Sequence, residues 1–570
     1  IAFHNNKGFN KMALTNVTNL SNLTLFAALV VILTLIMIKA TEQVAYPLTG
    51  YFSSLVSDYL EANQKLTPFY THTPDINGVK AAMAARDSFN TPRIALVNAL
   101  NKQYETVIAS DLVTANIQSL AKSKTYTVTT AHQPNLFTGP LYFIYKIAHT
   151  IALSRSLNKQ IPGAKFVPVY YMGSEDADLD ELGFVNIGGQ KLVWQTKQTG
   201  AVGRMLVDVE LLSLIKLIEG QIGVSVHGIA WVNLLKQSFT IGKTIAQATL
   251  EIVNHLFGEY GLVVVQPDST ALKSLFTSVI EKELTTGFSN EAVQKTMQEL
   301  GAHYKVQAAG RDINLFYLQN DSRERIVKTD TGYEVTALGL SFTKEQTLAD
   351  VQNNPANYSP NVILRGVFQE TIFPNIAFIG GGGELAYWLE LKQVFADAAV
   401  PFPVLLLRNS FLLVPAKQAL QLQKMHINTV NLFKGRPQVI IDSFVKANSV
   451  HHLQINTQMA AIEAQYTLIK EQAAAIDASL VDHIEALSHK QAQKLLQVQK
   501  KMLRAEKRKY EAEQQQITKI MEQLFPGGSL QERTENIADW YKIYGTHFVS
   551  AIVENSDDFS KGFTLLYLND

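Results

Sequence analysis

Thr125-Tyr-Thr-Val-Thr-Thr-Ala131 is the first of two strand-like runs that decide the fold of this chain, and Lys165-Phe-Val-Pro-Val-Tyr-Tyr171 is the second. A long apolar segment joins the two runs, and polar residues follow each of them. Strands that are buried on both faces of a parallel sheet are near-continuous apolar runs, and a helix usually connects them. The pattern therefore predicts a β-α-β unit of an α/β fold, with a helix from about Pro140 to about Leu157.

Titratable side chains follow both runs at the point where each strand should end. His132 follows the first run, and Glu175, Asp176 and Asp178 follow the second. Open parallel sheets bind ligands outside the carboxyl ends of their strands, so these four are candidate catalytic residues. The carboxylates could bind a divalent metal, orient an amine or act as a general base, and a solvated acidic loop is the alternative. His132 could bind phosphate or transfer protons, and a capping or structural histidine is the alternative.

Candidates for substrate binding lie between the two runs and in a second polar region farther along the chain. Tyr142 and Lys146 are about one turn apart near the start of the predicted helix, where anions are favoured. Residues 359–384 and the residues after the run 403–407 would form the opposite wall of a binding site. The full set is Asn135, Thr138, Tyr142, Lys146, Arg365, Gln369, Glu370, Asn375, Tyr387, Trp388, Arg408 and Ser410.

A glycine-rich turn follows the strand-like run Ala377-Phe-Ile379 and precedes a predicted helix. Such a turn could let a nucleotide phosphate approach the backbone at a helix N-terminus. The spacing matches neither the dinucleotide fingerprint nor the Walker pattern, so a tight turn explains it equally well. The residues predicted to bind nucleotide here are Gly380, Gly381, Gly382, Gly383 and Glu384.

The composition disfavours several classes of function. The chain has 570 residues, a formal net charge of zero and no cysteine. It lacks the basic footprint of a nucleic-acid-binding protein, so nucleic acid is not expected as a partner. Without cysteine there is no disulfide, no thiolate zinc site and no cysteine nucleophile, and a reducing compartment, the cytoplasm, is weakly favoured.

An apolar run from Leu23 to Ile38 dominates the first 44 residues. Its 16 residues fall short of the roughly 20 that span a bilayer. Three interpretations remain open, namely an extension outside the fold, a membrane anchor through residues 20–38, and a signal peptide, although no Ala-x-Ala cleavage site follows. We expect residues 1–44 to lie outside the fold, and we expect no membrane contact unless the anchor is real.

The rest of the chain is predicted to form a core, a helical arm and a return segment. Residues 45–445 carry further strand-like runs at 261–268, 377–383 and 403–407, with insertions at about 184–235 and 285–355. Residues 438–525 contain neither Gly nor Pro, and their apolar residues alternate four and three apart, as in a coiled coil. This pattern predicts an antiparallel coiled-coil arm over residues 446–525 and a return to the core over residues 526–570.

The turn of the arm can be placed from its heptad rhythm. The rhythm slips between Leu480 and Ile484, close to Asp477 and Ser479, which are both good helix N-caps. A helical hairpin should therefore turn there, and its second helix should run to about Leu524 over about 40 residues and roughly 60 Å. Self-association is the commonest use of such an arm, so a homodimer is expected.

Five motifs, taken together, resemble those of the bacillithiol biosynthesis cysteine-adding enzyme family. The resemblance runs from about Tyr46 to the C-terminus in the order of the family. One departure is Ala131-His132-Gln133, where many members have Gly-Gln-Gln. The motifs are His132-Gln-Pro-Asn-Leu-Phe-Thr-Gly-Pro-Leu-Tyr-Phe-Ile-Tyr-Lys146, Gly173-Ser-Glu-Asp-Ala-Asp178, Ser359-Pro-Asn-Val-Ile-Leu-Arg365, Gly380-Gly-Gly-Gly-Glu-Leu-Ala-Tyr-Trp388 and Phe525-Pro-Gly-Gly-Ser-Leu-Gln-Glu-Arg533.

The resemblance implies a fold, a reaction and a set of partners. The fold would be a Rossmann-like parallel-sheet core related to class I synthetases and nucleotidyltransferases, with inserted segments and a long coiled-coil arm that forms a dimer. The reaction would join L-cysteine to the amine of glucosaminyl malate in the last step of bacillithiol biosynthesis. The partners would be these two small molecules and a second copy of the chain.

Amide formation from a free carboxylate needs an activated acyl group, and a chain without cysteine cannot provide a thioester. We therefore expect ATP as an activating co-substrate, with no metal and no tightly bound cofactor. His132 and Lys146 would stabilise phosphate charge, while Glu175 or Asp176 would hold or deprotonate the amine. Two alternatives remain open: another ATP-dependent amide ligase or nucleotidyltransferase, and a coiled-coil assembly module.

Overall fold

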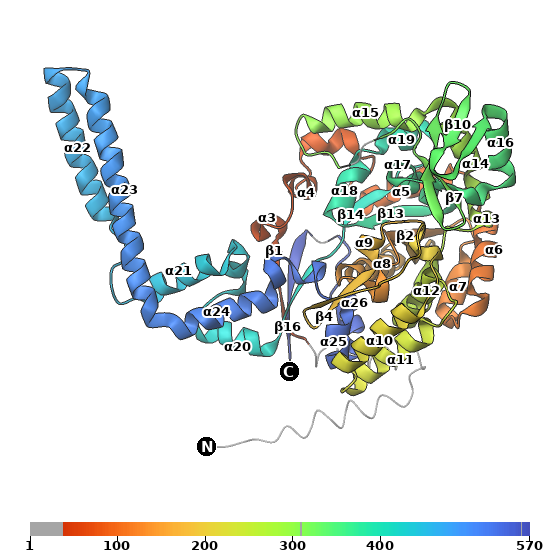
Figure 1. The fold of residues 1–570 in the computed structure, drawn as a ribbon, viewed down its shortest axis with the longest axis horizontal. Coiled ribbons are helices and arrows are strands. Elements are labelled where there is room, and N and C mark those ends of the chain that lie inside the picture. The colour runs from red at the N-terminus through yellow and green to blue at the C-terminus, as the bar shows by residue number, and fades with distance from the viewer. Residues whose placement is uncertain (1–37, 308–309, 560, 570) are drawn as a thin grey trace. The chain divides into compact units, whose positions relative to one another are not determined.

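The computed structural model describes residues 38–307, 310–559 and 561–569, and the chain divides into two compact units (Figure 1). Of the described residues, the first unit contains residues 38–47, 51–412 and 531–569. The second contains residues 48–50 and 413–530. The prediction places this division at residue 445, whereas the structure places it more than 30 residues earlier.

A five-stranded sheet forms the centre of the first unit. Neighbouring strands of this sheet are parallel throughout, which confirms the predicted parallel α/β core. The runs at residues 125–131 and 165–171 form adjacent strands, and Thr125 pairs with Lys165. In spatial order the strands are β14 (Val404–Leu407), β13 (Asn375–Gly380), β2 (Thr125–His132), β3 (Lys165–Met172) and β6 (Val263–Val265).

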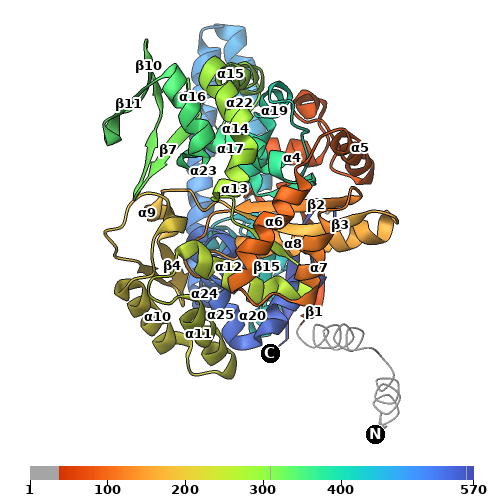
Figure 2. The ribbon, with the colours of Figure 1, turned by 90° about the vertical axis from the view of Figure 1, so that its right-hand side faces the viewer.

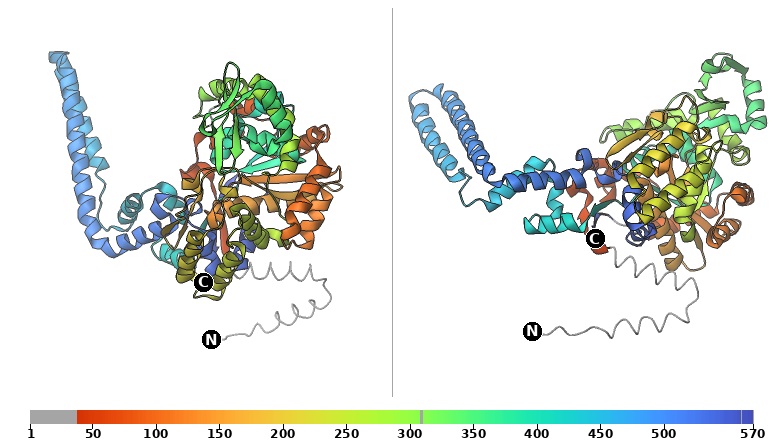
Figure 3. Two further views of the ribbon diagram at one scale, coloured as in Figure 1. Left: turned by 45° about the vertical axis from the view of Figure 1, so that its right-hand side comes forward. Right: turned by 60° about the horizontal axis from the view of Figure 1, so that its bottom comes forward.

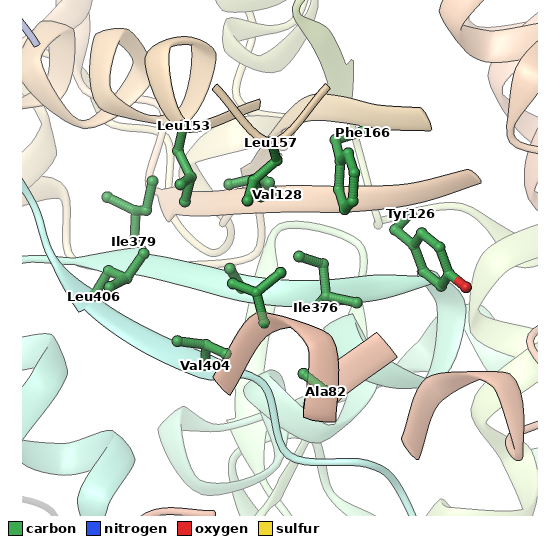
Figure 4. Packing of buried hydrophobic residues seen from close by; sticks show 12 residues of the cluster. Ala82, Tyr126, Val128, Leu153, Leu157, Phe166, Ile376, Ile379, Val404 and Leu406 are labelled. Carbon is green, nitrogen blue, oxygen red and sulfur yellow. The ribbon is translucent and has the colours of Figure 1, made fainter. Parts of the chain in front are cut away.

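Helices cover both faces of the sheet. Figure 4 shows Leu153 and Leu157 of α8 (Tyr142–Gln160) on one side of the strands and Ala82 of α5 (Ile76–Asp87) on the other. Burial of these apolar side chains from water stabilises the three layers. Helix α8 connects β2 to β3, as predicted, although it begins at Tyr142 and not at Pro140. Pro140 instead forms an isolated bridge with Asn536, which holds it outside the helix.

Long segments lie between successive strands of the central sheet. Between β3 and β6 come the hairpin of β4 (Phe184–Ile187) and β5 (Gln190–Val193), followed by three helices. Between β6 and β13 come further helices and two small antiparallel sheets, and Figure 2 shows β10 and β11 beside α16. The helices are α10 (Val209–Ile222), α11 (Val226–Ser238), α12 (Ile245–Phe257), α13 (Thr270–Lys273), α14 (Thr277–Thr286), α15 (Phe288–Gly301), α16 (Lys344–Asn353) and α17 (Val362–Ile372). The strands of the two small sheets are β7 (Leu315–Gln319), β8 (Ser322–Arg325) and β12 (Tyr358–Pro360), and β9 (Val327–Lys328), β10 (Gly332–Val335) and β11 (Leu340–Thr343).

The first described residues form strand β1 (Ile38–Ala45), which pairs antiparallel with β16 (Gly562–Leu568). The expectation that residues 1–44 lie outside the fold is therefore wrong for residues 38–44. Val44 is buried, and Tyr46 packs its ring against Phe563, so apolar contacts reinforce the strand pairing. The rest of the apolar run, residues 23–37, lies outside the described residues. None of the helices in the described part of the chain combines the length and the apolar character that a membrane crossing requires.

The second unit is helical and begins earlier than predicted. Its helices α20 (Ala416–Lys424) and α21 (Pro437–Asn448) were expected to belong to the core. Helix α21 instead packs on the arm, where Asp442 pairs with Lys507 and the Phe444 ring lies 5.8 Å from that of Tyr510. These contacts attach α21 to the arm and not to the core.

The arm is a helical hairpin of α22 (Asn456–Ile476) and α23 (Leu480–Lys507), which lie side by side in both views of Figure 3. The turn falls at residues 477–479, as predicted, and Asp477 accepts a hydrogen bond from the Ser479 N–H at 2.8 Å. The prediction of a single second helix of about 40 residues is wrong, because a 3₁₀ turn at Arg508–Tyr510 separates α23 from α24 (Glu511–Leu524). The Tyr510 hydroxyl donates to the Asn448 carbonyl at 2.7 Å, which fixes the interruption against α21.

Candidate active site

A cavity of about 880 Å³ lies at the carboxyl ends of the parallel strands in the first unit. The end of β2 contributes His132, and the turn after β3 contributes Glu175 and Asp176. The start of α18 (Gly382–Leu389) and the residue after β14, Arg408, complete the rim on the other side. This is the edge at which open parallel sheets bind ligands.

The cavity brings together twelve of the predicted site residues. They come from segments as far apart in the sequence as His132 and Arg408, and the fold of the parallel sheet places them together. The predicted residues that line it are His132, Tyr142, Lys146, Glu175, Asp176, Arg365, Gly381, Gly382, Gly383, Glu384, Tyr387 and Arg408.

Three predicted residues, Gln369, Glu370 and Asn375, lie away from the cavity in a buried polar network. The Glu370 carboxylate is fully buried and pairs with Arg86 at 2.7 Å. It also accepts hydrogen bonds from the side-chain amides of Gln369 at 2.9 Å and Asn375 at 2.7 Å. Burial raises the pKa of Glu370, and the Arg86 guanidinium opposes that rise. These residues tie α5 and α17 to β13, and the structure does not bring them to the cavity.

Trp388, Ser410 and Gly380 also serve the structure and do not line the cavity. The Trp388 ring stacks on Phe378 with the ring centroids 4.3 Å apart, inside the aromatic core. The Ser410 hydroxyl accepts a hydrogen bond from Arg408 at 3.0 Å and is fully buried. Gly380 is the last residue of β13, and its carbonyl accepts from the Arg408 N–H at 2.8 Å.

Asp178, Asn135 and Thr138 lie beside the cavity and do not line it. The Asp178 carboxylate caps the short helix α9 (Leu179–Leu182) by accepting from the Glu181 N–H at 3.0 Å. Asn135 and Thr138 are buried in the turn after β2, where Thr138 has a positive φ of 76°. Sequence position alone could not separate these residues from Glu175 and Asp176.

Glu175 is the first of a series of buried and partly buried side chains of alternating charge. Lys273 forms ion pairs with Glu175 and, at 3.2 Å, with Asp268. Arg204 binds Asp268 through two nitrogens, at 2.6 and 2.7 Å. Burial raises the pKa of the Glu175 carboxyl, and the Lys273 ammonium opposes that rise. The carboxylate is therefore oriented by a cation that the sequence analysis did not identify.

Asp176, next to Glu175, has a different environment. Its side chain accepts a hydrogen bond from the Gln133 amide at 3.1 Å and faces the cavity. Two adjacent carboxylates with different surroundings can divide the tasks of holding an amine and accepting its proton.

The His132 ring is an uncharged hydrogen-bonding group. It lies 5.3 Å from the Tyr142 ring and 5.4 Å from the Phe143 ring, measured between centroids. Burial, together with the nearby cations Lys146, Arg365 and Arg408, holds the pKa of His132 well below its ordinary value. Its Nε2 atom is buried and has no hydrogen-bond partner within the described residues. A neutral imidazole can donate or accept one hydrogen bond there, but it brings no positive charge to a phosphate.

The predicted phosphate site at the start of α18 already holds an anion of the protein. One oxygen of Glu384 lies 2.6 Å from the Lys146 ammonium and accepts from the Gly381 N–H at 2.8 Å. A carboxylate at a helix N-terminus occupies the position that favours a bound phosphate. A nucleotide phosphate fits at these glycines only if Glu384 moves away, so this arrangement disfavours the predicted nucleotide site.

Several residues that line the cavity escaped the sequence analysis. Arg323 enters from β8, where its Nε donates to the Ser359 hydroxyl at 3.1 Å and its Nη2 donates to the Pro360 carbonyl at 3.2 Å. Nothing in the local sequence of β8 indicates a site, because its position depends on how the long segment folds back. Arg533 also lines the cavity. It is the last residue of the fifth motif, and its place in that motif could have indicated a role at the site. The other lining residues of this kind are Gln133, Tyr171, Ser174, Gln307, Arg311 and Asn361.

Comparison with known proteins identifies the family. Residues 39–409 match the family described as "Bacillithiol biosynthesis BshC, N-terminal Rossmann-like domain". Residues 411–568 match "Bacillithiol biosynthesis BshC, C-terminal coiled-coil domain", which confirms the Rossmann-like and coiled-coil predictions.

Three relatives are similar over almost their whole length. Those from Flavobacterium johnsoniae and Christiangramia forsetii are each 36% identical to this chain, and the one from Flavobacterium psychrophilum is 37% identical. In every case the match covers 92% of this chain and 99% of the relative, and each relative is named "Putative cysteine ligase BshC". The chain, with its parallel-sheet core, coiled-coil arm and strand-end cavity, belongs to the bacillithiol biosynthesis BshC family.

Proposed function

We propose that this chain is a cysteine ligase that forms an amide between the carboxylate of L-cysteine and the amine of glucosaminyl malate, as the last step of bacillithiol biosynthesis. The observation that carries the proposal is the pair Glu175 and Asp176 in a strand-end cavity of about 880 Å³. Ligand pockets of this order hold drug-sized molecules, so the cavity has room for an amino sugar beside an amino acid. The names of the relatives and the family support the same reaction.

The carboxylates act on the nucleophile. An amine attacks a carbonyl carbon only in its neutral form, so a proton has to leave the sugar ammonium. Asp176, at the cavity surface, is the better placed to accept that proton, while Glu175 holds the nitrogen by a charge-assisted hydrogen bond. His132, Tyr142 and Tyr387 line the same cavity and can donate hydrogen bonds to the oxygen that gains negative charge.

ATP is proposed as the co-substrate that activates cysteine. The cysteine carboxylate oxygen would bond to a phosphorus atom of ATP and release either pyrophosphate or ADP. The sugar nitrogen would then bond to the carbonyl carbon and release AMP or phosphate. Each amide formed thus consumes one ATP. Where the phosphates bind stays a prediction, because Glu384 occupies the start of α18.

The test is the product mass after incubation with glucosaminyl malate, cysteine and ATP. We expect the mass of glucosaminyl malate plus a cysteinyl residue, with one nucleotide consumed for each product. Glu175→Gln and Asp176→Asn should each lower kcat/KM by about 100-fold or more. Asp180→Asn is the matched control, because Asp180 is an exposed carboxylate of the adjacent helix α9 that does not line the cavity. Absence of the product would refute the assignment, and product without nucleotide consumption would refute the role of ATP.

A homodimer through the arm is part of the proposal. The two-helix hairpin leaves apolar side chains exposed, including Ile469, Ile476 and Leu487. Among the heptad residues of α22, only Ala473 is buried, so the hairpin alone does not cover the predicted seam. A second copy would bury these side chains in the manner of a coiled coil.

Sedimentation equilibrium tests the dimer. The intact chain should have twice the mass of one copy, and the double variant Ile476→Glu/Leu487→Glu should have the mass of one. Lys490→Glu, on the same helix, is the control for a change of charge alone. A single-copy mass for the intact chain would refute the dimer.

We also propose that the protein works in the cytoplasm, where a thiol substrate stays reduced.

A further inference from the structure

Arg323 and Arg365 are two of the cavity arginines that have no anionic partner in the part of the chain that the structure describes. Within the described residues, neither Arg323 nor Arg365 forms an ion pair with a carboxylate. The Arg365 Nη2 donates to the Tyr387 hydroxyl at 3.2 Å, and Arg323 donates to a hydroxyl and a carbonyl, so every acceptor is a neutral group. Both side chains are partly buried. A cation held away from water without an anion is costly, which favours a negatively charged ligand.

The other strong charges at the cavity are already neutralised. Lys146 pairs with Glu384, Arg408 pairs with Glu532, and Glu175 pairs with Lys273. Among the described residues, the charged groups that line the cavity without such a pair are four arginines and two carboxylates. Two positive charges therefore remain in excess, which is the complement of a dianion. The unpaired groups are Arg311, Arg323, Arg365, Arg533, Asp176 and Glu181.

Both guanidinium groups are held in fixed positions. Arg323 lies over the Phe316 ring with its Cζ 3.9 Å from the ring centroid, and two further hydrogen bonds hold it to Ser359 and Pro360. Three of its five N–H groups have no protein acceptor among the described residues, and four of the five of Arg365 have none. A guanidinium fixed by neutral contacts is preorganised to bind a carboxylate through two parallel hydrogen bonds.

Arg365 also lies next to the turn that carries the carboxylates. A Cβ built on Gly173 would lie 3.5 Å from the Arg365 Nη1, so this nitrogen lies close to the residue two positions before Glu175. The positive N-terminal end of α17 faces the same space, because Asn361 and Val362 line the cavity. A ligand whose carboxylate is held by Arg365 can therefore place its amine beside Glu175 and Asp176.

We propose that Arg323 and Arg365 form a dicarboxylate subsite, which binds both carboxylates of the amine-bearing substrate and so places the amine against Glu175 and Asp176. This inference rests on the proposed function and specifies which residues select the malate group. A dicarboxylate fits better than a phosphate, because the helix start and the lysine that suit a phosphate are occupied by Glu384. It also fits better than cysteine, which carries one carboxylate.

Calorimetric titration of the full chain with L-malate, without cysteine or ATP, tests the subsite. We expect saturable binding by the unaltered protein. Arg323→Met and Arg365→Met should each weaken malate binding about tenfold or more, since each removes a charge-assisted pair. Arg325→Met is the matched control, because Arg325 is exposed on the same strand and does not line the cavity, and it should leave the affinity unchanged. Circular dichroism spectra establish that each variant is folded.

Two further ligands fix the chemical class. L-lactate, which lacks one carboxylate, should bind at least about tenfold more weakly than malate. Inorganic phosphate should also bind more weakly, and tighter binding of phosphate would overturn the dicarboxylate assignment. The subsite is likewise refuted if malate does not bind, or if the Arg323 and Arg365 variants bind it as the unaltered protein does.

Kinetics separates this inference from the proposed function. In active protein, Arg323→Met should raise KM for glucosaminyl malate and leave KM for cysteine near its original value. Amide formation with an unchanged KM for glucosaminyl malate would refute the subsite and leave the ligase. Arginine-dependent malate binding in a protein that forms no amide would refute the ligase and leave the subsite.

Discussion

Glu384 and Lys146 form an ion pair of 2.6 Å at the point where α18 begins, and the Gly381 N–H donates to the same carboxylate oxygen. Lys146 is almost fully buried, while Glu384 keeps some contact with the cavity. Burial lowers the pKa of Lys146, and Glu384 opposes that change. The protein thus provides its own anion for a buried ammonium and a helix N-terminus.

Removal of the charge of Glu384 should destabilise the fold. We expect Glu384→Gln to lower the free energy of unfolding by about 1–3 kcal/mol, because it leaves the buried ammonium with a neutral partner. Urea denaturation measures the loss. The control is Glu219→Gln, which breaks an exposed pair with Lys236 and should cost about 0.5 kcal/mol or less. An equal effect of the two substitutions would show that the ion pair adds no stability.

The same variant tests whether phosphate can bind at α18. If Glu384 competes with a bound phosphate, Glu384→Gln should bind inorganic pyrophosphate about tenfold or more tightly than the unaltered protein does. Calorimetric titration measures both affinities. Unchanged or weaker binding would place the nucleotide phosphates elsewhere.

Lys273→Met should move the acidic limb of the pH–rate profile. Lys273 opposes the rise that burial causes in the pKa of Glu175, and its removal should raise that pKa further. Asp268 and Arg323 also face Glu175. Lys273 pairs with Asp268 as well, so its loss exposes Glu175 to the negative charge of Asp268, which also raises the pKa of Glu175. Since only the ionised carboxylate can hold an ammonium, the acidic limb of kcat/KM should shift to higher pH. Lys273→Arg should restore the profile, and a loss of rate without a shift would indicate a structural role alone.

Arg86→Met should be among the most damaging substitutions outside the cavity. Both side chains of the Arg86–Glu370 pair are buried. The loss of one partner leaves an uncompensated buried charge and should lower the free energy of unfolding by about 3–5 kcal/mol. The double variant Arg86→Met/Glu370→Leu should recover a large part of this loss in urea denaturation. Lys124→Met is the control, since its pair with Asp87 is exposed. A double variant no more stable than Arg86→Met would contradict the charge argument.

The stability of the first unit should fall as the pH rises from about 4.5 to about 8, through Glu535. Burial raises the pKa of Glu535 from 4.5 to about 8, against a hydrogen bond that Trp540 donates at 2.9 Å. A raised carboxyl pKa means that the folded state binds the proton more tightly, so this stabilisation is complete below the unfolded pKa and is lost above the folded one. Glu535→Gln should remove this dependence, and at pH 8.5 it should be more stable than the unaltered protein by on the order of 2 kcal/mol. Parallel stability curves for the two proteins between pH 5 and 8.5 would contradict it.

The sequence was informative where local pattern and position decide the outcome. The apolar runs at β2 and β3 predicted two parallel neighbours, and the polar residues after them, His132, Glu175 and Asp176, line the cavity. The heptad rhythm likewise predicted the turn at Asp477. In each case the residues of one segment were enough to make the prediction.

The sequence was uninformative where the partner of a side chain lies far along the chain. Glu370 lies five residues after Arg365 on α17, about 140° around the helix, and it faces Arg86 in the core while Arg365 faces the cavity. The pattern of the helix separates the two faces, but it does not report that the partner of Glu370 is Arg86. Arg323 and Lys273 reach the site from segments whose placement depends on tertiary packing. The interruption at Tyr510 depends on Asn448, which is 62 residues away in the sequence. No periodicity within one segment reports such contacts.

The strand order of the central sheet also constrains how the chain reaches its native state during synthesis. Strand β2 ends at His132, but its neighbour β13 begins only at Asn375, so β2 keeps an unpaired edge until more than 240 further residues have been made. Pairing across such a separation closes a long loop and is slow, and an open apolar strand edge is prone to aggregate. A nascent chain that stalls between these two strands would therefore expose the unpaired edge of β2. We expect the chain to need chaperones most during that interval.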